Sequence, residues 1–309
     1  MKKINFLLYL FFLFMIFFVG CDQQTQEASN QIPVIIEIGQ FSDPVYADTK
    51  LTIPFFIKNS GPFALKNLQI YLLSSGFVKS KTASLNSLDP NQETILFMPD
   101  IEFVKNFLNE VSNSKSLEFE YAYEYQGNSM LSFCVANPKS EYDPNLKTLC
   151  NVRDSPKITN TPSHIVVSDA KVEIQTKNSM MFEFKIKKVT NEKLYVEEVN
   201  KLNEYLKDRV KGAKESLRLS ISSQHFDPSN SKCYFNDVYG SEITRKMSDP
   251  FTLYFEGDTI NVKCYIILKN DAQNQLDKEP YSFQALIAMN YDYTVAGKLS
   301  KGVTIINPR

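Results

Sequence analysis

Long stretches of strict alternation between apolar and polar residues constrain this fold more than any other feature of the sequence. In LEFEYAYEY, residues 117–125, Leu117 and the aromatic residues at every second position share one face, and the glutamates share the other. TINVKCYIIL, residues 259–268, alternates in the same way, as does SFQALIAMNYDYTV, residues 282–295. A period of two is typical of half-buried β-strands. The sequence therefore predicts a mainly β protein.

Turn signals divide much of the remaining chain into further short candidate strands. Asn59-Ser60-Gly61 ends the candidate strand LTIPFFIKN, and Gln126-Gly127-Asn128 is expected to turn residues 117–125 back into the partner strand MLSFCVA as a hairpin. Short strands separated by turns are typical of a β-sandwich.

A polar stretch with several prolines interrupts the strand pattern at residues 137–163. We interpret it as a linker and place a domain boundary near Thr161. We expect one sandwich at residues 33–160 and a second β-rich sandwich at residues 161–309, each long enough to bury a core.

Two segments have apolar residues at helical spacing and are expected to be helices inserted among the strands. The first is residues 100–111, where Asp100 can cap the N-terminus and a core-covering role is favoured over partner binding. The second is about residues 192–211, which ends before Gly212.

The residues VYADTKLTIPFFIKNSGPFALKNLQIYLL, at positions 45–73, follow a strand, Asn-x-Gly, extended segment and strand pattern. This part of the chain resembles the adhesion-associated, CARDB-like domains of bacterial and archaeal surface proteins. The resemblance implies an immunoglobulin-like sandwich of seven strands, used as a spacer or adhesive module, and it implies no catalytic residue. The expected fold is tandem immunoglobulin-like β-sandwich domains with two inserted helices.

The N-terminus has the layout of a secretory signal. Lys2 and Lys3 precede an uncharged apolar run of about 14 residues, Phe6 to Val19, which falls in the range of a signal-peptide core. A helix that spans the hydrocarbon core of a membrane needs about 20 apolar residues.

Phe18-Val19-Gly20-Cys21 resembles a lipobox, in which the cysteine receives a lipid and the preceding peptide is removed; Phe18 departs from the usual leucine. We therefore expect a lipoprotein signal peptide at residues 1–20, lipid attachment at Cys21 and a flexible tether at residues 21–32. In Gram-negative bacteria the resemblance would give Asp22 a role in retention at the inner membrane. The alternative is an uncleaved signal anchor with a buried cysteine.

Four cysteines follow Cys21, and an even number in an exported chain implies disulfides. Four cysteines allow three pairings. We prefer the local pairs Cys134–Cys150 and Cys233–Cys264, since each pair then falls in its own half of the chain. The alternative is four free, buried thiols.

Charge and motif content exclude several function classes. The formal net charge is −1, and the loss of residues 1–20, which hold two lysines and no acid, would make it −3. We therefore expect no nucleic-acid partner. The two histidines, His164 and His225, have no nucleophile motif to serve, so we expect no catalytic residue. The sequence contains no cofactor fingerprint, and we expect no bound cofactor and no metal site.

Two loops rich in oxygen ligands leave a calcium alternative open, although neither has EF-hand spacing. One contains Asp227 and Asp237, and the other contains Asp271 and Asp277. A plain surface loop is the favoured interpretation of both.

Aromatic residues in the second half are the candidate contact residues for a partner, with burial within the strands as the favoured alternative: Tyr234, Tyr239, Tyr291 and Tyr293. We expect a non-enzymatic, lipid-anchored protein on the extracytoplasmic side of a cell-envelope membrane, acting in adhesion, as a scaffold or as a protein-binding module. Its expected partners are the membrane, through the lipid, and a neighbouring envelope protein. A solute-binding lipoprotein of a transporter is the alternative, and an envelope hydrolase is less favoured.

Overall fold

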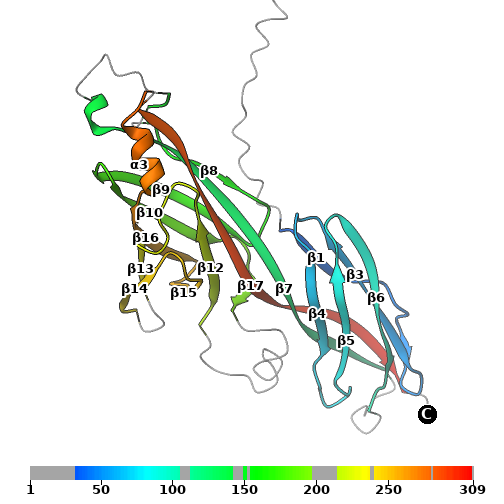
Figure 1. The fold of residues 1–309 in the computed structure, drawn as a ribbon. Helices are drawn as coiled ribbons and strands as arrows, with labels where there is room; N and C mark the ends of the chain where they lie inside the picture. Colours follow the sequence, from blue (N-terminus) through cyan, green and yellow to red (C-terminus); the bar gives the residue numbers. More distant parts are fainter. Residues whose placement is uncertain are drawn as a thin grey trace, which may run out of the picture.

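The computed structural model describes residues 32–104, 112–141, 149–151, 154–196, 214–236, 240–279 and 281–307. The predicted signal peptide and Cys21 lie outside these residues. The described part is mainly β, with one short α-helix, and its strands form three sheets that are antiparallel except for one short parallel pair (Figure 1). Among the described residues, no helix is both long enough and apolar enough to cross a bilayer.

The three-stranded sheet has the order β1-β3-β6. Its strands are β1 (Val34–Ile38), β3 (Leu51–Asn59) and β6 (Gln92–Ile101).

The nine-stranded sheet has the central order β15-β12-β17-β7-β4-β5, with three short strands paired to β7 or β17. Its strands are β2 (Val45–Tyr46), β4 (Leu65–Leu72), β5 (Lys81–Leu88), β7 (Ser112–Ala136), β8 (Lys157–Asn160), β11 (Lys193–Tyr195), β12 (Ser216–Ser222), β15 (Phe251–Tyr254) and β17 (Ser282–Ile306).

The five-stranded sheet has the order β14-β13-β16-β10-β9. Its strands are β9 (Ile165–Thr176), β10 (Ser179–Lys188), β13 (Lys232–Asn236), β14 (Glu242–Lys246) and β16 (Thr259–Ile267). The helical elements are the 3-10 helix η2 (Pro138–Glu141) and the α-helix α3 (Asn270–Leu276).

Two strands of 25 residues each, β7 and β17, form a central two-stranded ribbon. They pair antiparallel along their whole length, from Ser112 opposite Ile306 to Ala136 opposite Ser282. Figure 1 shows this ribbon running through two groups of strands, one containing β1, β3 and β6 and the other containing β9, β10 and β16.

Each smaller sheet is in side-chain contact with the nine-stranded sheet. The Phe55 ring of β3 meets the Phe119 ring of β7 edge-on, with centroids 5.2 Å apart. At the other end, the Phe235 ring of β13 stacks on the Phe251 ring of β15 at 4.9 Å. Both contacts join buried side chains that alternate along their strands. The three-stranded sheet at one end and the five-stranded sheet at the other thus each form a second layer on the shared sheet. We call these two ends the first and the second layered core, although their buried side chains form one connected cluster.

The ribbon of β7 and β17 connects the two predicted domains. The division at residues 160 and 161 remains a prediction. However, β17 lies in the predicted second domain and pairs with β7 of the predicted first domain, and its end also pairs in parallel with β2. The chain therefore leaves the first layered core along β7 and returns to it along β17.

The predicted hairpin turn at Gln126-Gly127-Asn128 is wrong, because β7 continues through it. Residues 126–128 lie opposite residues 290–292 of β17, and the Gln126 amide donates to Asp292 Oδ1 at 2.8 Å. Gly127 allows β7 to lie close to Ser163, since a Cβ at position 127 would lie 3.0 Å from that side chain. Long-range pairing overrides the local turn preference at this point.

The two predicted helices are not found where the structure describes their residues. Asp100 and Ile101 end strand β6, and Phe103 forms a bridge with Val78, while residues 105–111 lie outside the described part. Lys193–Tyr195 form β11, and residues 197–213 lie outside the described part. In both places, described residues pair with a neighbouring strand instead, Ile101 with Leu51 and Lys193–Tyr195 with β17.

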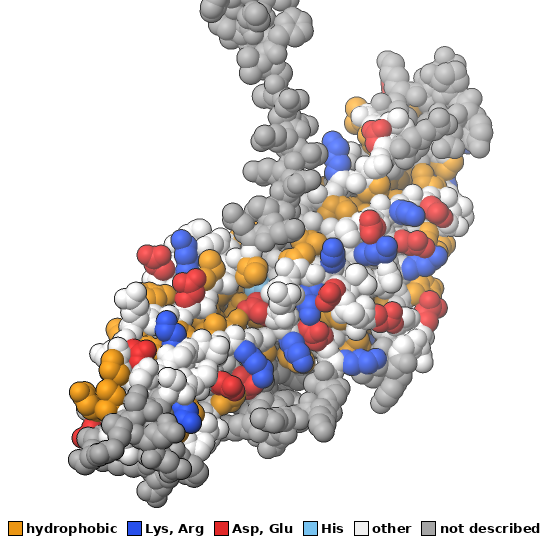
Figure 2. All heavy atoms as spheres, turned by 180° about the vertical axis from the view of Figure 1, so that it is seen from behind, with side chains coloured by type: hydrophobic (Ala, Val, Ile, Leu, Met, Phe, Trp, Pro, Cys, Tyr) orange, Lys and Arg blue, Asp and Glu red, His pale blue; other side chains and the backbone are white. Residues whose placement is uncertain are grey.

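Figure 2 shows the face opposite to that of Figure 1. Basic and acidic side chains lie intermixed over it, with hydrophobic side chains between them. Neither sign of charge dominates this face, which agrees with the near-zero net charge of the sequence.

Candidate functional site

Both predicted disulfides form in the structure. Cys134 of β7 is bonded to Cys150, 16 residues later, and so joins the segment after η2 to the central ribbon. Cys233 of β13 is bonded to Cys264 of β16, which lies directly opposite it in the five-stranded sheet. Disulfides persist in oxidising compartments, so the chain fits an extracytoplasmic location.

The predicted contact tyrosines differ in their exposure to solvent. Tyr291 and Tyr293 are 1% and 3% exposed, so their prediction as contact residues is wrong. They point inward because β17 alternates and their face covers the core. Tyr234 is half-buried at the rim of a cavity on the five-stranded sheet, and Tyr239 lies outside the described residues.

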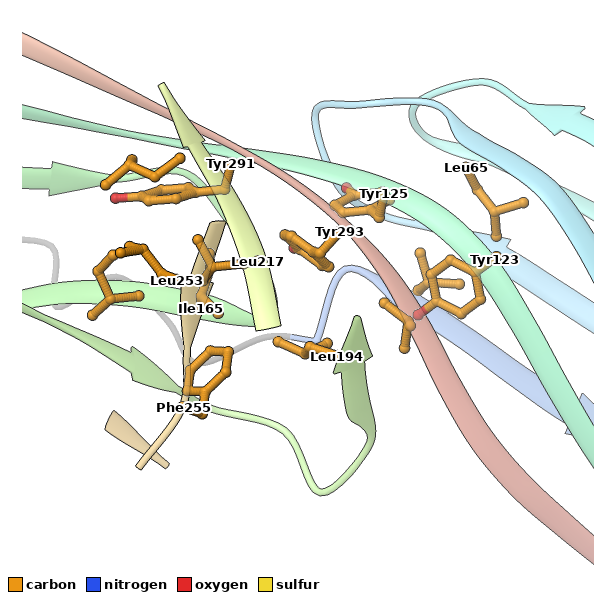
Figure 3. Close-up of a cluster of buried hydrophobic side chains, with 14 of the residues drawn as sticks. Leu65, Tyr123, Tyr125, Ile165, Leu194, Leu217, Leu253, Phe255, Tyr291 and Tyr293 are labelled. Atoms are coloured by element: carbon orange, nitrogen blue, oxygen red, sulfur yellow. The ribbon is translucent and has the colours of Figure 1, made fainter. Parts of the chain in front are cut away.

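A buried polar cluster lies beside the central ribbon, on the face that carries Tyr291 and Tyr293. Figure 3 shows Tyr125 and Tyr293 between Leu65 on one side and Leu217 on the other. We call this buried polar cluster the junction cluster. Its members are Tyr121, Tyr123, His164, Glu192 and Tyr293.

His164 is at the centre of the junction cluster and is fully buried. Its Nε2 lies 2.9 Å from the phenolic oxygen of Tyr123, and its Nδ1 lies 3.1 Å from that of Tyr293. The His164 backbone N–H also donates to Tyr293 Oη at 3.3 Å. Because a neutral imidazole has one N–H, the ring donates through one nitrogen and accepts through the other.

Glu192 closes the cluster on its outer side. One carboxylate oxygen accepts a hydrogen bond from Tyr121, and the other accepts one from Thr190 Oγ1 at 3.0 Å and lies 3.5 Å from His164 Nε2. Tyr121 reaches the carboxylate by lying over Gly297, where a Cβ would clash with its phenolic oxygen.

Burial sets the protonation states in the junction cluster. It lowers the pKa of His164 to about 3, so the ring is neutral at pH 7. Burial also raises the pKa of Glu192, and it raises the pKa values of Tyr123 and Tyr293 well above the ordinary value. These groups resemble the parts of an acid–base site, but His164 has no exposed surface through which a substrate could reach it. Their arrangement holds together β7, β17 and the segments on either side of β9 and β10.

A cavity of about 600 Å³ opens on the five-stranded sheet and reaches Tyr254 of β15. Most of the side chains that line it are charged or are amides, and they come from β9, β10, β13, β14, β16 and the turn before β16. The lining includes Asp169, Glu183, Lys185, Tyr234, Asn236 and Lys263.

Four of the charged side chains around this cavity form two ion pairs. Lys263 Nζ lies 2.7 Å from Glu183 Oε1, and Lys185 Nζ lies 3.3 Å from Asp169 Oδ2. The hydrogen bond to Glu183 raises the pKa of Lys263. Such a surface offers donors and acceptors of both signs beside a tyrosine, which suits a polar partner surface or a polar small molecule.

The outer face of the three-stranded sheet carries a different surface. We call it the apolar surface, and its members are Ile35, Pro54, Phe56, Ile95 and Phe97. Phe97 is 56% exposed, Phe56 and Ile95 are 47% exposed, and Ile35 is 45% exposed. Sequence reasoning missed it, although FFI and ILFMP are apolar at consecutive positions, which a strand with one solvated face does not require.

In the loops considered for calcium, Asp227 and Asp277 make other contacts, and Asp237 lies outside the described residues. Asp227 accepts hydrogen bonds from the backbone of Ser229 and the side chain of Asn230, which lower its pKa. Asp271 and Asp277 lie at the two ends of α3, and Asp277 pairs with Lys177. Within the described residues, no three potential ligands lie close enough to hold a metal ion.

Comparisons with known proteins place the chain in no family. No family model and no curated protein matches it. Among solved structures, it is similar to the secreted serine protease VesC from Vibrio cholerae at 9% identity, with 83% of this chain and 50% of that chain covered and a TM-score of 0.21.

Two other solved structures are similarly distant. Red sea bream transglutaminase shares 8% identity over 90% of this chain and 32% of that chain, with a TM-score of 0.22. A Porphyromonas gingivalis protein of unknown function shares 10% identity over 76% of this chain and 83% of that chain, with a TM-score of 0.19. The chain thus spans half of the protease and a third of the transglutaminase. TM-scores this low establish no common fold, and no functional argument rests on them.

Proposed function

We propose that this chain is a non-enzymatic, lipid-anchored protein of the cell envelope, built from tandem immunoglobulin-like sandwiches and serving as a scaffold that binds a neighbouring envelope protein. The observation that carries the proposal is the pair of disulfides, each fixed to a strand of the continuous β framework. Such bonds fit an exported protein, and the signal-like N-terminus supplies the route and the anchor.

The surface proposed for the partner is the rim of the cavity on the five-stranded sheet. It combines Tyr234 with paired charges, among them Lys263 and Glu183. Non-obligate protein interfaces have this mixed polar character, with tyrosine enriched at their centres. Complementary charges on a partner would fix its register on the sheet.

Two measurements test the proposal. Mass spectrometry of the mature N-terminus should find a chain that begins at a lipid-modified Cys21, and an unmodified Cys21 in a chain starting at Met1 would defeat the anchoring. A photo-reactive phenylalanine analogue at Tyr234 should cross-link a specific neighbour on intact cells. The matched control places the analogue at exposed Tyr46, on the other layered core. If neither position captures a neighbour while known envelope contacts are captured, a spacer role is the better account.

A solute-binding lipoprotein is the second candidate, and the cavity is the observation that favours it. Its paired lysines and carboxylates, together with the side-chain amide of Asn236, would suit a polar solute. Calorimetric titration of the purified chain with pools of sugars, amino acids and short peptides distinguishes the two. Saturable binding that is lost in Lys263→Ala would favour the solute role over the protein partner.

A hydrolase remains the less favoured alternative. It would need a nucleophile and a base that a substrate can reach, and the His164 side chain has no exposed surface. Hydrolysis of model esters or peptides by the purified chain, abolished by His164→Ala in a protein that still folds, would support it.

A further inference from the structure

The apolar surface is a contiguous block on two neighbouring strands. Phe56 of β3 lies opposite Ile95 of β6, and Pro54 lies opposite Phe97, so the four side chains form two adjacent cross-strand pairs. Cross-strand neighbours on one face of a sheet are in side-chain contact. Gly39 lies beneath the block, since a Cβ there would be 2.6 Å from the Phe56 ring.

Charged residues border the block along the strands. Ile35 lies opposite Lys58, and Glu37 lies opposite Phe56. Lys58 in turn faces Glu93. An exposed aromatic block with a charged border of both signs is a feature of surfaces that contact an apolar phase, because a monomer in water gains nothing from exposing two phenylalanines.

The position of this block along the chain indicates what covers it. The described structure begins at Ile32, two residues before the start of β1, and Ile35 of β1 already belongs to the apolar surface. Cys21 is eleven residues before Ile32. A chain of that length reaches at most about 40 Å, and usually much less when it is flexible. Among the sheets, the three-stranded one is therefore tethered most closely to the proposed lipid.

We propose that the apolar surface rests on the lipid bilayer, with Phe56, Ile95 and Phe97 entering the boundary between headgroups and acyl chains. The inference rests on the proposed lipid anchor at Cys21, which raises the local concentration of bilayer around this sheet. Docking of the three-stranded sheet leaves the cavity with Tyr234, on the other layered core, free for a partner. Because the border carries both Lys58 and two glutamates, docking does not require anionic lipid.

The chain contains no tryptophan, so a single introduced tryptophan is a fluorescent reporter without background. The reporter is Ile95→Trp in the full-length, lipidated protein, reconstituted in phosphatidylcholine vesicles with or without lipids brominated on their acyl chains. The matched control is Tyr265→Trp, at a half-buried position of β16 in the five-stranded sheet. A third protein carries Ile95→Trp together with Phe56→Ser and Phe97→Ser.

In brominated vesicles, the reporter at position 95 should lose at least about twofold more emission than the control at position 265, since bromine quenches only at the depth that docked side chains reach. The serine substitutions should abolish that difference, and the result should be unchanged by added salt or by anionic lipid. Circular dichroism checks that the three variants are folded. Folding should be retained, because the substituted side chains are exposed or half-buried.

Other outcomes overturn the inference in distinct ways. Equal quenching at both positions, or none at either, would mean that this face does not dock on lipid. An emission at position 95 that is already blue-shifted without vesicles would mean that another part of the chain or, if it depends on protein concentration, a second copy covers the surface. Failure to find lipid on Cys21 defeats the proposed anchor itself, whereas a lipidated chain without selective quenching defeats only the docking.

Discussion

The phenolic oxygen of Tyr123 lies 2.9 Å from Nε2 of His164, and both side chains are buried. A hydrogen bond between two buried polar groups contributes little net stability. If one partner is removed, however, the other stays buried without a hydrogen bond to protein or water, which costs free energy. The pair therefore makes the contact between β7 and the segment before β9 specific.

His164→Ala should lower the free energy of unfolding by about 3 kcal/mol, because it leaves a cavity and removes the ring that Tyr123 and Tyr293 contact. Urea unfolding followed by circular dichroism measures this change. His225→Ala is the matched control, since His225 is partly exposed and should cost less than about 1 kcal/mol. Equal effects of the two substitutions would contradict a special role for the junction cluster.

The same histidine predicts how stability depends on pH. Its pKa is lowered from about 6.5 in the unfolded chain to about 3 in the folded protein. Between these values the unfolded state binds a proton that the native state does not, so the stability due to His164 falls as pH falls. The slope is at most about 1.4 kcal/mol per pH unit.

The test compares the wild type with His164→Gln, which keeps a polar side chain but cannot titrate. Their difference in unfolding free energy should shrink by about 3 kcal/mol between pH 7 and pH 4. Glu192, with its raised pKa, acts in the opposite direction, since the stability it contributes is lost as pH rises through its folded pKa. It is present in both proteins. A difference that stays constant with pH would show that His164 titrates normally in the folded state.

Gly297→Ala should destabilise the protein by about 1–3 kcal/mol, because its Cβ would meet the phenol of Tyr121. Gly302, in the same strand, has no atom within 4 Å of the position that a Cβ would occupy, and it serves as the control. Gly302→Ala should be neutral or stabilising by up to about 1 kcal/mol. Thermal unfolding of the two variants measures both changes in stability. A smaller loss of stability in Gly297→Ala than in Gly302→Ala would exclude the close approach of Tyr121 to Gly297.

Asn59→Asp should cost about 2–3 kcal/mol, because the buried Asn59 amide donates to the carbonyl oxygens of Phe63, Leu88 and Asp89 at 2.8–3.2 Å. A carboxylate in this place cannot donate and would face the same oxygens. Asn91→Asp is the control at an exposed turn position of the same layered core. Urea midpoints measured at pH 7 should separate the two variants, and similar midpoints would refute the role assigned to Asn59.

Alternation predicted much of this fold because it records which side of a strand faces the core. Met180, Phe182, Phe184 and Ile186 are all buried in β10, as their spacing of two indicates. The disulfides were predicted on other grounds, the even cysteine count and local pairing within each half of the chain, and both bonds are confirmed. Asn59 was recognised only as a turn residue, and its hydrogen bonds to a distant segment leave no local signal.

Other features depended on contacts that a local pattern does not contain. Gln126-Gly127-Asn128 has turn residues, yet pairing with β17 keeps it extended. Tyr291 and Tyr293 alternate clearly, but alternation does not say which face of the strand is outside. The loop KNDAQNQLDKE contains α3, whose seven residues are too few for a periodic signal. The cavity depends on β9, β10, β13 and β16 meeting, which only the assembled sheets reveal.

The path of the chain through β7 and β17 has a mechanical consequence. Strand β2, close to the proposed tether, pairs in parallel with the last residues of β17, so both described ends of the chain belong to the same layered core. Tension applied between the membrane and the C-terminus would act on the first core, where β1 pairs with β3 and β2 pairs with β17. The chain builds the second core between β7 and β17. That core would therefore lie outside the path of the force and would keep its shape under tension.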